Sequence, residues 1–165
     1  MSNPPRRSQR MIPVEWILKR FDELTLDELY EALRLRVDVF VVEQNCPYPE
    51  LDGMDRVSLH LLGREAGRLL AYLRLFRRPG EDRTAQLGRV VTSERGKGYG
   101  AELLRRGILA ASEVLRCDEI TIEAQSYAAG FYARAGFEVC SDEFLEDGIP
   151  HIRMHMKIKD RDLTK

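Results

Sequence analysis

The feature of this sequence best suited to chemistry is a glycine-rich turn that carries two cations. It reads Arg95-Gly-Lys-Gly-Tyr-Gly100, follows an apolar segment that ends at Thr92, and leads directly into a segment of helical periodicity. Glycines let backbone N–H groups come close to a ligand, and the start of a helix adds partial positive charge, so a pyrophosphate is the expected guest. The two cations add formal charge. We expect this site to consist of Arg95, Gly96, Lys97, Gly98, Tyr99, Gly100 and Ala101.

Two other interpretations of the turn stay open. The glycines could simply make a tight connection. The spacing Gly96-x-Gly98-x-x-Ala101 also satisfies the loose form of the dinucleotide fingerprint, which would make the protein a nicotinamide-dependent enzyme. That fingerprint begins at the end of a strand, whereas Thr92-Ser-Glu-Arg95 separates the strand from the first glycine here. A P-loop is excluded, because no Gly-Lys-Ser or Gly-Lys-Thr ending is present.

Charge and cysteine content restrict the class of protein. The 165 residues carry 26 basic and 27 acidic side chains, so no overall field would draw the chain to nucleic acid or to an anionic membrane. The cysteines, Cys46, Cys117 and Cys140, are odd in number and lack the close pairs that structural zinc needs. The sequence contains neither an apolar run of membrane-spanning length nor a signal peptide. We expect a reduced, cytoplasmic protein that binds no metal.

Capping and breaking residues divide the chain. We expect a mobile basic tail over residues 1–12, one domain over residues 13–160 and a short tail over residues 161–165. Thr25-Leu-Asp-Glu28 has the form of a capping box that opens a helix. Prolines, an asparagine and a glycine then interrupt regular structure over residues 43–55, where we expect an irregular loop of the kind that often carries function.

Beyond the loop the apolar period changes from helical to alternating, which predicts strands. We expect strands over residues 14–19, 57–61, 68–76, 85–92, 120–122 and 152–158 and another from Gly136, with helices from Thr25 to about Val42, over residues 98–116 and over residues 128–134. The order predicts an α/β (α+β) fold: a mixed, mainly antiparallel sheet flanked by helices, with one strand-turn-helix unit that carries the phosphate site.

Two motifs together resemble the GNAT acetyltransferase superfamily. Arg95-x-x-Gly98-x-Gly100 after a strand is similar to the turn on which that family holds the coenzyme A pyrophosphate. Gln125, Phe131-Tyr132 and Gly136-Phe137 resemble its closing motif, in which an Asn usually stands at the position of Gln125. Longer segments are similar to the ElaA-like branch of the superfamily, namely residues 39–48, 52–53, 88–90 and 146–151, and the likeness spans about residues 14–157.

The resemblance implies a GNAT-like fold and an N-acyltransferase that uses acetyl-CoA as the donor. It implies that the exposed backbone of Val90, Val91 and Thr92 pairs with the pantetheine arm of the donor. It also implies that Tyr132, four residues before Gly136, protonates the departing thiolate. A phenol is protonated at neutral pH, as this role requires. The alternative for Tyr132 is a core tyrosine with a hydrogen-bonded hydroxyl.

The sequence does not fix the base that takes the amine proton. Many members of the superfamily place a Glu on the strand before the turn, but residues 86–92 contain no carboxylate. Glu43, His60, Glu123 and His151 are the candidates, with a water chain as the alternative. We place Glu43 and His60 first, although a glutamate at a helix end is often only solvated and a lone strand histidine is often structural.

We expect Arg89, Gln125 and His151 to contact the acceptor. Arg89 could bind a substrate carboxylate, or it could pair with Glu123 on a neighbouring strand. Arg105 and Arg106 could reach the 3′-phosphate of the donor or form a solvated helix face. The three cysteines show no triad pattern, so a route through an acyl-cysteine is only an outside hypothesis.

The leading hypothesis is therefore an enzyme that moves an acetyl group directly from acetyl-CoA to an amine of a small molecule or a protein. The alternative is a non-catalytic acyl-CoA-binding sensor, which the missing strand carboxylate keeps open. We expect no nucleic-acid or membrane partner. A homodimer is compatible with the sequence.

Overall fold

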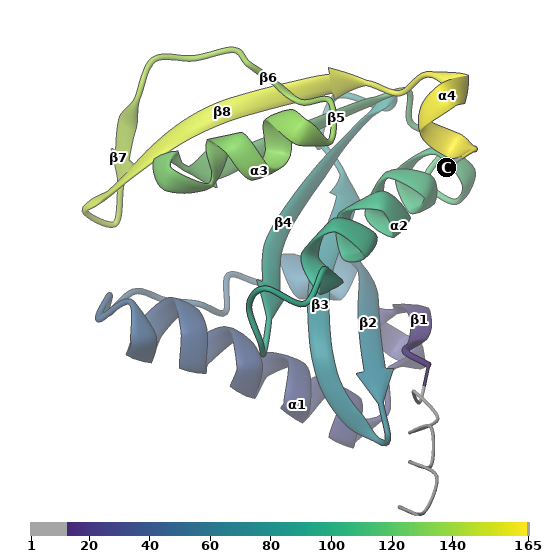
Figure 1. Cartoon of the computed structure of the whole chain (residues 1–165), viewed down its shortest axis with the longest axis vertical. Coiled ribbons are helices and arrows are strands. Elements are labelled where there is room, and N and C mark those ends of the chain that lie inside the picture. The colour runs from purple at the N-terminus through teal and green to yellow at the C-terminus, as the bar shows by residue number, and fades with distance from the viewer. Residues whose placement is uncertain (1–12, 165) are drawn as a thin grey trace, which may run out of the picture.

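A computed structural model describes residues 13–164 of the chain. Within this range the strands form one eight-stranded sheet with helices packed on it (Figure 1). The predicted mixed α/β class is confirmed. The predicted basic tail, residues 1–12, lies outside the described residues. The predicted short tail over residues 161–165 begins within a short helix, Asp160–Leu163. No described helix is long and apolar enough to cross a membrane.

The elements have the following bounds. The strands are β1 (Glu15–Arg20), β2 (Leu59–Glu65), β3 (Arg68–Arg77), β4 (Thr84–Thr92), β5 (Glu119–Gln125), β6 (Glu138–Val139), β7 (Phe144–Glu146) and β8 (Ile149–Lys157). The helices are α1 (Leu26–Arg36), α2 (Tyr99–Glu113), α3 (Ala129–Arg134) and α4 (Asp160–Leu163). A π-helical segment, Val37–Glu43, extends α1, and short 3-10 turns cover Phe21–Glu23, Met54–Val57 and Ser126–Ala128.

The sheet is antiparallel except at one place. Its order is β1-β2-β3-β4-β5-β8-β6, with β7 paired to β8. The strands β1 to β4 run antiparallel to one another, the β4–β5 pair is parallel, and the pairs that include β8 are antiparallel. That pair is joined by α2, which makes the predicted strand-turn-helix unit. The short β7 and its hairpin with β8 were not predicted.

Helices cover both faces of β2 and β3. Leu61 and Leu73 belong to the main core together with residues of α2, whereas Leu62 and Tyr72 pack with Ala32 of α1. Because neighbouring residues of a strand point to opposite faces, burial of both sets places α1 and α2 on opposite sides of the sheet.

The strand predicted over residues 57–61 is confirmed only from Leu59 onward. Val57 lies in a 3-10 turn and is exposed, and the strand begins at Leu59. His60 is as fully buried as its apolar neighbours, because its face is covered as well. A strand buried on both faces loses the period-two pattern.

The helix predictions are confirmed in outline. Thr25 caps α1, with its Oγ1 accepting from the Glu28 N–H at 3.1 Å and Glu28 Oε1 accepting from the Thr25 N–H at 2.9 Å. Helix α2 starts after Gly98 and lies close to the sheet at Gly107, where a Cβ would come within 2.9 Å of Leu73 and of Leu87. Its C-terminal end falls at Glu113, three residues before the predicted boundary.

A bulge interrupts β4 near its centre. Tyr72 is opposite Val91 and Arg74 is opposite Gly88, so Leu73 alone faces both Arg89 and Val90. Arg89 takes the left-handed conformation, with φ of 54°. A bulge bends its strand and increases the local twist. In agreement, β4 pairs with β5 only over residues 84–86, and the two strands separate beyond this point (Figure 1).

Candidate active site

The separation of β4 from β5 opens a cleft of about 600 Å³. Residues 87–90 of β4 form one wall and residues 122–125 of β5 form the other. Tyr132 of α3, the loop after the π-helical segment and the β7–β8 hairpin complete the lining. Past residue 86 the edge of β4 that faces β5 has no partner strand within residues 13–164, so backbone groups there are open to a ligand.

The predicted phosphate turn joins β4 to α2. Gly96 and Gly98 both have φ of 77°, and a Cβ at either position would meet nothing within 4 Å. No side chain caps the helix, and the first N–H groups of a helix lack intrahelical partners. Arg95 contacts Glu43 at 2.7 Å and Lys97 contacts Glu94 at 3.1 Å. Backbone shape and charge thus suit a pyrophosphate, although both cations already have carboxylate partners.

Tyr132 faces the cleft from α3. Its ring meets Phe131 and Phe137 edge to face, at centroid distances of 5.1 and 5.9 Å. Phe131 in turn lies under the start of α2, where a Cβ on Gly100 would come within 3.4 Å of its ring. The Tyr132 hydroxyl has no hydrogen-bond partner among residues 13–164. Burial raises the pKa of Tyr132 above its usual value near 10, so the hydroxyl keeps its proton.

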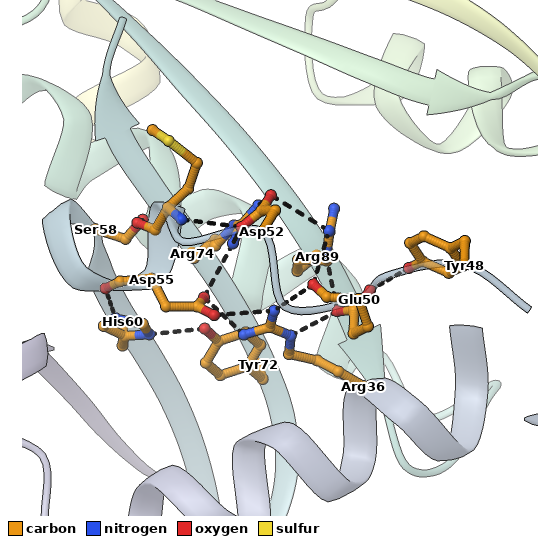
Figure 2. Close-up of polar contacts among 11 residues, drawn as sticks. Arg36, Tyr48, Glu50, Asp52, Asp55, Ser58, His60, Tyr72, Arg74 and Arg89 are labelled. Carbon is orange, nitrogen blue, oxygen red and sulfur yellow. Dashed lines mark hydrogen bonds and ion pairs between the residues drawn. The ribbon is translucent and has the colours of Figure 1, made fainter. Parts of the chain in front are cut away.

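A buried ionic network borders the cleft, with Arg36 at its centre (Figure 2). The Arg36 side chain is 1% exposed. Its Nε donates to Glu50 Oε1 at 2.7 Å, and its Nη1 and Nη2 donate to the oxygens of Asp55 at 2.7 and 3.3 Å. Helix α1 is thereby tied to the irregular loop at two points.

These two carboxylates and Asp52 also bind two arginines of the sheet. Arg74 of β3 donates to Asp55 at 3.0 Å and to both oxygens of Asp52, at 2.8 and 2.5 Å. Arg89 of the β4 bulge donates from Nε to Glu50 Oε1 at 2.7 Å. Three guanidinium groups thus face three carboxylates, and the network carries no net charge. Three members, Asp52, Arg74 and Arg89, also line the cleft.

The network shifts the pKa of its members. The hydrogen bond from Arg74 holds the pKa of Asp52 well below its usual value. Burial alone would raise the pKa of Asp55, but the hydrogen bonds and charges of Arg36 and Arg74 outweigh burial and lower it. The Tyr48 hydroxyl donates to Glu50, and burial followed by this carboxylate raises the pKa of Tyr48. Asp52 and Asp55 stay ionised and Tyr48 stays neutral near neutral pH, so these groups hold the loop and do not exchange protons.

Arg89 does not form the ion pair with Glu123 that we considered. The bulge turns its side chain to Glu50, and its Nη2 also lies 3.5 Å from Asp52. Glu123 instead pairs with Arg153 of β8 at 3.0 Å. The reason is the separation of β4 from β5, which puts the two side chains on opposite walls of the cleft.

The predicted bases lie in different surroundings. Glu43 is half-exposed, binds Arg95 and does not line the cleft. His60 is buried, with Nε2 donating to the Asp55 carbonyl at 2.8 Å and Nδ1 accepting from the Tyr72 hydroxyl at 2.7 Å. Burial lowers the pKa of His60. Glu123 and His151 do line the cleft. The structure therefore brings only the last two near Tyr132.

Two contacts join the irregular loop after the π-helical segment to the side of the cleft formed by β5 and the β7–β8 hairpin, which we call the far wall. Gln44 and Gln125 exchange side-chain hydrogen bonds at 3.2 and 2.9 Å. The Cys46 thiol donates to the Asp147 carbonyl at 3.4 Å. Gln125, predicted to contact the acceptor, thus lies at the cleft but binds a protein group. Sequence reasoning did not include Gln44, whose partner is 81 residues away.

The remaining predicted residues lie on surfaces or in the core. Arg105 and Arg106 both bind Glu102, at 2.8 Å each, and Arg106 also lies over the Trp16 ring. Cys46 and Cys117 are buried and Cys140 is exposed, and all three are free thiols.

Residues 36–158 match the acetyltransferase (GNAT) domain family. A UPF0039 protein of Schizosaccharomyces pombe is 40% identical over 152 residues, which cover 90% of this chain and 100% of that protein. ElaA of Escherichia coli is 35% identical over 149 residues, which cover 88% of this chain and 97% of ElaA.

Two solved structures are also similar to this chain. The crystal structure of an acyl-CoA N-acyltransferase from Pseudomonas aeruginosa superposes with a TM-score of 0.80 at 42% identity, covering 86% of this chain and 98% of that one. The crystal structure of E. coli ElaA gives a TM-score of 0.82 at 34% identity, covering 87% and 99%. The similarity therefore includes the cleft and the turn that leads into α2.

Proposed function

The chain belongs to the GNAT acetyltransferase family, in its ElaA-like branch, and we propose that it transfers an acetyl group from acetyl-CoA directly to an amine. The observation that carries this proposal is the cleft between β4 and β5, which has an open strand edge on one side and an unpartnered tyrosine hydroxyl facing it. This is the arrangement needed to align a thioester and to protonate its sulfur.

The turn before α2 supports a place for the donor's pyrophosphate. Its uncapped N–H groups and the helix dipole favour an anion, and the positive φ of Gly96 and Gly98 leaves no Cβ in the way. Arg95 and Lys97 would exchange their carboxylates for phosphate oxygens. The donor's pantetheine arm would then lie along Val90–Thr92, whose open edge offers backbone hydrogen bonds.

Tyr132 is the proton donor in this proposal. The Tyr132 side chain is partly buried and lines the cleft, and its hydroxyl has no hydrogen-bond partner among the described residues, so it is available to a ligand there. Its raised pKa keeps the hydroxyl protonated at neutral pH, so the proton is in place when the leaving thiolate forms beside it. The neighbouring aromatic rings fix its position.

The charge of the far wall supports an amine as the acceptor. Glu123, Glu146 and Asp147 line the cleft on this side. Glu123 has Arg153 as a partner, but neither Glu146 nor Asp147 has an arginine or lysine partner within residues 13–164. An amine is protonated in neutral solution, so this wall attracts it.

Tyr132→Phe tests the proposal, because it removes the hydroxyl and keeps the ring. We expect single-turnover acetyl transfer to fall by roughly 100- to 10,000-fold, while binding of acetyl-CoA changes little. Tyr30→Phe, on an exposed tyrosine of α1, is the matched control. A wild-type protein that binds acetyl-CoA but acetylates no amine of a broad panel would refute the enzyme and favour a sensor. An unchanged rate in Tyr132→Phe would refute only the role of Tyr132.

A further inference from the structure

His151 occupies a defined position on the far wall of the cleft. It lies near the start of β8, opposite Gln125 of β5 on one side and Phe144 of β7 on the other. Its ring stacks on Phe144, with centroids 6.0 Å apart and planes inclined by 25°. The residue is 9% exposed and lines the cleft. The ring is therefore held in one place.

The hydrogen bonds of the ring determine its tautomer. Nδ1 lies 2.7 Å from the carbonyl oxygen of Ile149. A carbonyl can only accept, so Nδ1 carries the hydrogen. In the neutral ring the lone pair then lies on Nε2, which has no donor directed at it among residues 13–164 and lies 3.5 Å from Glu146 Oε2. An ionised Glu146 would stabilise the ring once Nε2 gained a proton.

The other acid–base groups near the cleft are occupied. Asp52 is held by both terminal nitrogens of Arg74, and Glu123 by Arg153. Asp147 and Glu146 are exposed carboxylates, and Glu146 faces His151. A proton acceptor that is fixed, shielded and unoccupied is found only at His151 among the cleft residues described.

We propose that His151 is the general base that takes a proton from the acceptor ammonium, with Glu146 as the residue that stabilises the imidazolium. The inference rests on the proposed function. It assigns separate groups, Tyr132 and His151, to the two proton transfers, and both line the cleft.

The protons and electron pairs balance. Nε2 of His151 takes one N–H proton of the ammonium, and the electron pair of that bond becomes the lone pair that forms the C–N bond. As the C–S bond breaks, its electron pair goes to sulfur, which receives the Tyr132 proton. The nitrogen loses a second proton, which restores Tyr132 through water. His151 releases its proton to solvent, so the net products are an amide, a thiol and one proton.

His151→Gln is the first test, with single-turnover transfer measured at saturating acetyl-CoA. We expect the rate to fall by roughly 100- to 10,000-fold while the affinity for acetyl-CoA is kept. His155→Gln is the matched control, since His155 lies on the same strand, is partly exposed and does not line the cleft. Glu146→Gln should cause a smaller loss, because the proton acceptor remains.

A second variant separates chemistry from folding. His151→Ala leaves space for a free imidazole, and we expect added imidazole to restore part of the transfer rate in this variant and to leave the wild type unchanged. Wild-type turnover with equal rates in His151→Gln and His155→Gln would overturn the inference alone. Absence of rescue in a folded His151→Ala protein would also count against it. Failure of the wild type with every amine would overturn the proposed function, and the inference with it.

Discussion

Replacing Arg36 with methionine should remove a large part of the stability of this protein. The change keeps an unbranched side chain on α1 and deletes the guanidinium that ties the helix to the loop. Glu50 would keep Arg89 and Tyr48, and Asp55 would keep Arg74, but each carboxylate would lose an arginine contact of 2.7 Å. The balanced network would become a buried group with one excess negative charge.

The size of the expected loss of stability follows from the burial of Arg36 and its partners. The Arg36 side chain is 1% exposed, and Glu50 and Asp55 are 2% and 9% exposed, so water cannot replace the lost hydrogen bonds without opening the loop. Breaking a buried ion pair by removing one partner typically costs about 3–5 kcal/mol. The whole free energy of unfolding of a domain is typically about 5–15 kcal/mol.

Urea unfolding followed by circular dichroism would measure the effect. Arg34→Met is the control, because Arg34 lies on the same helix, is 72% exposed and contacts Asp38 at 3.8 Å. Such exposed pairs contribute about 0–1 kcal/mol. A difference between the two variants of less than about 1 kcal/mol would refute our reasoning and show that the network is solvated or readily rearranged.

Two further predictions concern the phosphate turn and His60. Gly98→Val should abolish the thermal stabilisation that CoA gives the protein. Gly80→Val is the control: this residue of the β3–β4 turn has a similar φ of 78° and no Cβ contact, so the variant should carry the same backbone strain and still be stabilised by CoA. Equal CoA affinity in the two variants would contradict the site. Burial lowers the pKa of His60 below 6.5, so the unfolded chain binds the proton first, and the free energy of unfolding should fall as pH decreases through about 6.5, by at most about 1.4 kcal/mol per pH unit. Urea unfolding at several pH values should show a smaller dependence of this free energy on pH in His60→Gln. An unchanged dependence would disprove the prediction.

The features predicted correctly from sequence are those that depend on residues close together in the chain. The capping box at Thr25 and the glycine turn before α2 each depend on a few consecutive positions, and the structure contains both. The resemblance of Phe131-Tyr132 and Gly136-Phe137 to the family's closing motif predicted that Tyr132 faces the cofactor; the structure has it lining the cleft, while its catalytic role stays a prediction. The β7–β8 hairpin was missed although Asp147-Gly148 is a readable turn signal.

The ionic network could not be predicted in this way. Arg36 meets Glu50 and Asp55 across 14 and 19 residues, and Arg89 meets Glu50 across 39. Charged residues are usually exposed, so their sequence pattern alone gives no sign of burial. The only local signal was the set of three acids between residues 50 and 55. Pairing then depends on the β4 bulge, for which Gly88 inside the predicted strand was the only local sign.

The two walls of the cleft carry their charges in different ways, and this difference bears on turnover. On the loop side, arginines and carboxylates neutralise one another, so Asp52 and Arg74 give the cleft polarity without a net field. On the β8 side, Glu146 and Asp147 have no arginine or lysine partner among the described residues. A cationic amine is attracted to that wall, but the neutral amide formed from it is not. In the proposed reaction, which removes one positive charge, product binding would thus be weaker than substrate binding, and release would be favoured.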